Sequence, residues 1–261
     1  MSIRFRSAPV IEIGITYWIE PSVEQPDWYN LALALGEKFR KDYPHGEVFY
    51  ENDIKITEKT KLGLPKKGKV TSLVRQANFW SQHKDRLYSI GGNFFSFRRF
   101  RKENSMDDLH FASVLEEADE IYSEYVSEWM PQQIKQIAIS YVDDICIPIS
   151  SESNIKIEDY LKLGVVAPFE SISFSDCELH FSLPPHEDFG GKMLVRFYRA
   201  PAEVAVFRMI LQWNCLIENI NSVDKTLIKQ GLDYGHKHCY NNFIECLTQK
   251  TIELFDPILN E

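Results

Sequence analysis

Two adjacent aspartates are the residues of this chain that most suggest chemistry. Asp143 and Asp144 follow Tyr141 and Val142 in the apolar segment ISYVDDICIP, residues 139–148. Paired carboxylates can hold two divalent metal ions, which stabilise the attacking and leaving oxygens during phosphoryl transfer. The segment therefore raises the question of whether the chain carries a metal-dependent catalytic site.

The expected geometry of this segment argues against that chemistry. The same four residues occur in the palm of reverse transcriptases, where a tight hairpin turn brings the two carboxylates together. Here the apolar flanks predict one continuous strand over 134–148, on which Asp143 shares a face with Ile139 and Ile145 while Asp144 points to the opposite face. Since neighbouring strand residues cannot share a metal, we expect both aspartates to be structural. We also expect Asp143 to have a buried partner, because it lies among isoleucines.

A second candidate lies near the C-terminus, in the segment Gly235-His236-Lys237-His238-Cys239. On a helix His236 and His238 point in different directions, whereas His236 and Cys239 can share a face and ligate zinc. The alternative is that His236 borders an apolar stripe and makes one buried hydrogen bond. We favour the hydrogen bond, and we predict neither a metal site nor a cofactor.

Composition narrows the classes of protein. The chain has 261 residues, of which 44% are hydrophobic and 26% charged, as expected of a globular protein with a substantial core. No apolar run reaches the length of a membrane helix and the N-terminus lacks a signal-peptide cleavage site, so we expect a cytoplasmic protein with no membrane contact. Five cysteines without CxxC spacing indicate reduced thiols. The formal charge of −9 opposes binding to duplex nucleic acid.

Hydrophobic periodicity predicts the same order of elements twice. The first half is predicted to contain a strand at 9–21, a helix from Asp27 to Pro44, strands at 47–57, 69–80 and 86–100, and a helix from Ser105 to Pro131. The second half is predicted to contain a strand at 134–148, a short helix over 155–163, strands near 170–183, 192–199 and 203–213, and one long helix from Asp224 to Phe255.

This order predicts an α+β fold built of duplicated β-α-β-β-β-α units. We expect a single domain made of two pseudo-symmetric halves, 1–131 and 132–261, because no Gly/Ser-rich linker separates them. Such a repeat is most economically built as one antiparallel sheet with its helices packed on one face.

Glu12 and Arg98 are the remaining candidates for a site. Glu12 is a carboxylate in an otherwise apolar strand; it could face a cleft between the two halves, or pair with Arg98 or Arg196 on a neighbouring strand, and the ion pair is favoured. Arg98 opens a basic run over 98–102 that would attract phosphate if gathered on one surface, but is more typical of a solvated edge. No GxGxxG, P-loop, GxSxG or HExxH motif is present.

Several segments resemble a sporadically distributed, functionally uncharacterised bacterial family of similar length. The opening APVIEI is similar to the family's "aPivEa" start, and ISYVDDICIP is similar to its "lRYiNrIeiP" strand, followed in both by a DYL segment. The closing GHKHCYNNFIECLT resembles a helix in which a histidine precedes an "Fe..It" signature; the matching residues are His236, Phe243, Glu245 and Thr248. The chain departs from the family in having Asp143 in place of asparagine and Ser140 in place of arginine.

The resemblance implies no established activity. Patchily distributed families of this kind often accompany mobile-element or anti-phage defence genes, which implies a dedicated protein partner encoded nearby.

Two functional classes remain at this level. The first is a non-enzymatic binding or regulatory protein that recognises a protein partner of complementary basic charge, or a small ligand in a cleft between the halves. Its final helix would present Tyr234 and Tyr240 to the partner, unless both rings are merely half-buried against neighbouring loops. The alternative is an enzyme of unrecognised type, a metal-dependent nuclease or nucleotide-processing protein that uses Glu12, Asp143 and Asp144. The absence of a nucleophile-base-orienter pattern favours the first class. The sequence leaves the oligomeric state open.

Overall fold

A computed structural model describes most of the chain. It covers residues 4–5, 8–20, 28–59, 65–102, 109–129, 131–148, 159–162, 176–201 and 206–258, with the side chains of residues 4, 52–59, 65–73, 176–177 and 257–258 outside that description.

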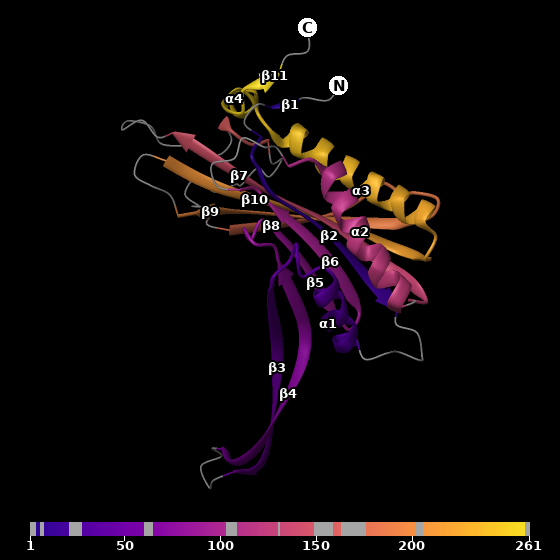
Figure 1. Ribbon diagram of the computed structural model, residues 1–261. Helices are drawn as coiled ribbons and strands as arrows, with labels where there is room; N and C mark the ends of the chain where they lie inside the picture. Colours follow the sequence, from indigo (N-terminus) through magenta and orange to yellow (C-terminus); the bar gives the residue numbers. More distant parts are fainter. Residues whose placement is uncertain are drawn as a thin grey trace.

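One large antiparallel sheet organises these residues (Figure 1). Its nine strands lie in the order β3-β4-β5-β6-β2-β7-β10-β9-β8. Their bounds are β2 Val10–Glu20, β3 His45–Lys59, β4 Pro65–Trp80, β5 Arg86–Gly91, β6 Phe94–Phe100, β7 Gln133–Pro148, β8 Asp176–Ser182, β9 Gly190–Ala200 and β10 Val206–Ser222. The first strands of the two predicted halves, β2 and β7, are therefore neighbours, and the mixture of helices with one antiparallel sheet confirms the α+β class.

Four helices accompany the sheet: α1 Trp28–Lys38, α2 Phe111–Trp129, α3 Lys225–Cys246 and α4 Gln249–Leu254. Contacts join α1 to β4 and β5, α2 to β2 and β6, and α3 to β7 and β10. The strands meet the helices through alternate residues, so that Ile13, Ile15 and Tyr17 of β2 are buried and Tyr17 stacks on Tyr122 of α2. The residues between these buried ones point to the opposite side of the sheet, away from the helices. We call this side the open face.

The predicted strand over 86–100 is wrong in one respect, because it is two strands. The turn at Gly92 and Asn93 folds β6 back on β5, with Arg86 paired to Arg99 and Gly91 to Phe94. The first half therefore has four strands after its first helix, not the predicted three. Gly and Asn are the residues that a short hairpin loop favours, so a turn signal was present inside the apolar run.

The predicted final helix is also wrong as a single element. Helix α3 begins after Asp224, whose carboxylate accepts from the Thr226 N–H, and it ends at Cys246. Leu247 then forms an isolated β-bridge with Leu161, and Thr248 caps the separate helix α4. Residues 159–162 contain no α-helix, and the rest of the helix predicted over 155–163 lies outside the described residues. The residues at which two further helices were predicted to begin, Asp27 and Ser105, also lie outside them.

The described ends of the chain meet in a small separate sheet, in which β1, Arg4–Phe5, pairs with β11, Pro257–Ile258. No helix within the described ranges has both the length and the apolar character that a membrane span requires.

The strands β3 and β4 extend beyond the rest of the sheet as a two-stranded ribbon (Figure 1). Strand β5 pairs only with residues 76–80 of β4, and β3 pairs with β4 alone. We call the outer part of this ribbon, residues 49–59 and 65–75, the arm.

Candidate functional site

The two adjacent aspartates lie on opposite faces of β7, as the sequence predicts. Asp143 is only 2% exposed and belongs to the face that packs under α3. Asp144 lies on the open face, where its carboxylate accepts from Nε and Nη2 of Arg208 on β10 at 2.7–3.0 Å. One metal ion cannot be ligated from both sides of a sheet, so the pair cannot form a two-metal catalytic centre.

Burial sets the chemistry of Asp143. Desolvation raises the pKa of its carboxyl to about 7, and the nearby Trp213 indole lowers it only in part. The Trp213 N–H is not in hydrogen-bonding geometry, because neither it nor Asp143 Oδ1 has a partner among the described residues. The expected buried partner is therefore missing for this oxygen. A carboxyl in such a place is favoured in its neutral form.

His236 makes the buried hydrogen bond that the sequence favoured over a metal site. Its Nδ1 lies 2.6 Å from the Tyr141 hydroxyl of β7, and its ring stacks on Phe111 of α2 at a centroid distance of 4.3 Å. Burial lowers the pKa of the imidazole. This contact joins α3 to both β7 and α2. Within the described residues no three His, Cys, Asp or Glu side chains gather as a metal site requires.

Tyr234 is held against a loop. Its hydroxyl donates to the backbone carbonyl of Pro184, and its ring packs edge-on against Phe189 and His238. This is the half-buried alternative that the sequence left open. Tyr240 is also partly buried, on the same helix.

Glu12 and Arg98 form the predicted ion pair on the open face. Arg98 Nη1 lies 3.2 Å from Glu12 Oε1, across β6 and β2. Desolvation raises the pKa of Glu12, while the guanidinium lowers it. The predicted site residues therefore do not converge: Glu12 and Arg98 lie on the open face, Asp143 and His236 lie between the sheet and α3, and Tyr234 lies on the outer side of α3.

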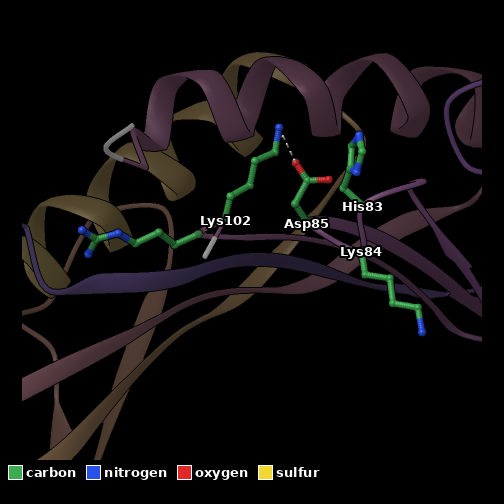
Figure 2. A pocket seen from close by; sticks show the side chains of 5 residues that line it. His83, Lys84, Asp85 and Lys102 are labelled. Carbon is green, nitrogen blue, oxygen red and sulfur yellow. Dashed lines mark ion pairs between the residues drawn. The ribbon is translucent and has the colours of Figure 1, made fainter. Parts of the chain in front are cut away.

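Figure 2 shows a hollow of about 470 Å³ in the basic region after β4 and β6, lined by His83, Lys84, Asp85, Arg101 and Lys102. Lys102 lies 3.3 Å from Asp85, and Ser81 donates to the same carboxylate at 2.7 Å. Lys84 points away from both of these residues (Figure 2). The basic side chains around this hollow do not point to one common position, as a bound anion would require. The ion pair and the hydrogen bond of Asp85 instead stabilise the loop that forms the hollow.

A hollow of about 610 Å³ lies on the open face, across strands from both halves. We call it the open-face hollow. Its lining mixes polar and apolar residues and is almost uncharged. It consists of Thr16, Trp18, Gln76, Asn78, Leu87, Ser89, Phe94, Ser96, Arg98, Ala138, Ser140, Leu194, Asn214 and Leu216. Of the predicted site residues only Arg98 belongs to this lining.

Sequence reasoning missed most of this surface, and it missed the arm. Small polar residues at alternate positions, such as Ser89 and Ser96, are the signal for one polar strand face. They become a site only when the order of the strands places them side by side. Phe49 and Tyr50 of the arm are 50% and 59% exposed, although their residue types predict burial.

No protein-family model, no curated protein and no solved structure matches the chain. The resemblance to a sporadically distributed bacterial family therefore stays a prediction.

Proposed function

We propose that this chain is a non-catalytic binding or regulatory protein that acts through a protein partner, and that the arm is the surface that the partner covers. The observation that carries the proposal is the arm itself, a ribbon that has, among the described residues, no neighbouring strand on either edge beyond the reach of β5. Two strands alone are marginally stable in water, so a ribbon of this length gains stability when another protein packs against it.

Exposed aromatic side chains support this use of the arm. Phe49 and Tyr50 are adjacent at its base, so their exposed rings point to opposite faces of the ribbon and each face offers a partner one aromatic anchor. Strand β3 is the edge strand of the sheet, and a free edge offers backbone groups to which a partner can add a strand.

Charge indicates the chemistry of the partner surface. The whole chain carries −9, but the arm contains more Lys and Arg than Asp and Glu, with Lys66, Lys67 and Lys69 close together in β4. Opposite potentials speed association, so the surface that meets the arm is acidic, whereas a surface that meets the body is basic. The aromatic pair and the acidic body favour protein over nucleic acid.

The internal duplication is part of the same proposal. From the centre outward the first half runs β2, β6, β5, β4, β3 and the second runs β7, β10, β9, β8, so the first half has one strand more. In each half the first strand is central and its successors follow in reverse chain order. This correspondence supports two pseudo-symmetric halves with the helices on one face. We further propose, from the sequence alone, a cytoplasmic protein encoded beside its partner in a mobile-element or defence locus.

Co-purification tests the function. The full-length protein is expressed with the products of its neighbouring genes, and we expect one acidic-surfaced product to remain bound through affinity purification and gel filtration. The double substitution of Phe49→Ser and Tyr50→Ser removes the complex. The matched control is Leu33→Ser with Val223→Ser, which changes two apolar residues of similar exposure outside the arm and leaves the complex intact. Loss of the complex in both variants, association with a second copy of the chain, or binding to duplex DNA contradicts the proposal.

A further inference from the structure

The open-face hollow is formed by the pairing of seven strands. In register, Asn78 lies beside Ser89, Ser89 beside Ser96, and Ser96 beside Thr16. Arg98, Gly14, Ser140 and Asn214 make a second row across the same face. The floor is therefore a lattice of hydroxyl and amide groups at fixed strand spacing, on rigid elements.

Several polar side chains of this floor are buried, and several have hydrogen-bonding groups that a ligand could use. Asn78, Ser89 and Ser96 are each no more than 6% exposed, although they lie on the side of the sheet away from the helices. Thr16 and Ser96 share a hydrogen bond of 2.9 Å. The side chains of Ser89, Ser140 and Asn214 make no hydrogen bond to the described part of the chain. Hydroxyls and amides can both donate and accept, so they suit a ligand with mixed polar edges.

A flat apolar platform adjoins this floor. The Phe94 ring lies across Gly91, because a Cβ at that glycine would come within 2.2–3.0 Å of three ring atoms. Only glycine allows the ring to lie so close to the backbone, with its other side turned to the hollow. Trp18 is the register partner of Phe94 on β2 and lines the same hollow. Such aromatic surfaces stack on planar rings.

The hollow offers no spare charge. Arg98 is its one formally charged residue, and this guanidinium is paired with Glu12. Elsewhere on the open face Arg208 is paired with Asp144, and Lys192 with Glu218. A phosphate or carboxylate would have to break one of these pairs to be neutralised.

We propose that the open-face hollow binds an uncharged heteroaromatic ligand of the nucleobase or nucleoside type. The ring stacks on Phe94 and Trp18, its donor and acceptor edge meets the Asn78 amide, and further hydroxyls meet Ser89 and Ser96 of the floor. A volume of about 610 Å³ is in the range of small-molecule sites. This inference stands independently of the arm and its partner.

Calorimetry with defined probes tests the proposal. The full-length protein is titrated with adenosine, guanosine, cytidine and uridine, with their 5′-monophosphates, and with methyl glucoside as a flat-faced hydroxylated ligand that lacks a π system. We expect at least one nucleoside to bind, its monophosphate to bind no more tightly, and methyl glucoside not to bind.

Two variants at opposite ends of the hollow locate the site. Asn78 lies on β4 near the ring platform, and Asn214 lines the same hollow on β10, five strands away. We expect Asn78→Leu to weaken nucleoside binding about tenfold or more, and Asn214→Leu to leave it unchanged. Absence of binding by every nucleoside, tighter binding of a monophosphate, equal binding of the glucoside, or equal effects of the two variants overturns the proposal.

Discussion

Asp143→Asn isolates the energetic effect of a charge buried under α3. The pKa of this carboxyl is about 7 in the folded protein, against about 3.9 in an unfolded chain. Between these two values the folded state keeps a proton that the unfolded state releases, so the stability of the parent protein falls as pH rises from about 4 to about 7. The variant lacks this group and loses that dependence.

The size of the effect follows from the same pKa difference. Each unit of pKa corresponds to about 1.4 kcal/mol, so ionised Asp143 costs the folded state about 4 kcal/mol above pH 7. The new asparagine amide must itself find partners, which costs about 1–3 kcal/mol at either pH. We therefore expect the variant to be more stable than the parent by about 1–3 kcal/mol near pH 8, and less stable than it near pH 4.

Urea unfolding of both proteins at the two pH values measures this quantity. At each pH the free energy of unfolding of the parent is subtracted from that of the variant. We expect this difference to change by about 4 kcal/mol between the two pH values, because the cost of the asparagine is the same at both and cancels. The nearby groups stay neutral over this range, because burial raises the pKa values of Tyr141 and Cys246, and a hydrogen bond with Cys215 together with burial raises that of Cys239. A difference that does not change with pH would refute the reasoning that Asp143 is buried without adequate compensation.

Three further predictions test the packing under α3 and the open face. Gly235→Ala should be less stable than Gly231→Ala by about 1 kcal/mol or more in urea unfolding. A Cβ at position 235 would lie 2.8 Å from buried Ile139, whereas the atom nearest to a Cβ at position 231 is 3.3 Å away. Equal stabilities of the two variants would contradict this packing. Tyr141→Phe should cost about 1–3 kcal/mol, since it leaves a buried imidazole nitrogen without its partner, and an unchanged unfolding midpoint would show that this bond is unimportant. Asp144→Asn should cost less than about 1 kcal/mol, because its ion pair is partly exposed; magnesium-dependent nucleotide incorporation that this variant abolishes would restore the catalytic reading.

The hydrophobic periodicity of a single strand was sufficient to predict on which face of the sheet its side chains lie. The two-residue repeat of β7 placed Asp143 and Asp144 on opposite faces, and the isolated carboxylate of β2 led to its pairing with Arg98. The hairpin at Gly92 was missed because apolar residues continue on both sides of the turn and mask its signal.

Long-range pairing decided what the sequence could not predict. His236 reaches Tyr141 across 95 positions of the chain, and the sequence supplied only the expectation of one buried hydrogen bond. The floor of the open-face hollow depends on the order of its strands, which no single strand encodes. The arm depends on β5 being shorter than β4, and this difference in length cannot be recognised from β3 and β4 alone.

Hydrogen–deuterium exchange gives the most direct test that the protein acts by binding a partner through its arm. Backbone amides of residues 49–59 and 65–75 are followed in the full-length protein alone and with each product of the neighbouring genes. The account predicts that one product slows exchange throughout these two segments and leaves exchange in α2 unchanged. Slowed exchange confined to α3, or unchanged exchange in the arm when a stable complex has formed, would contradict it.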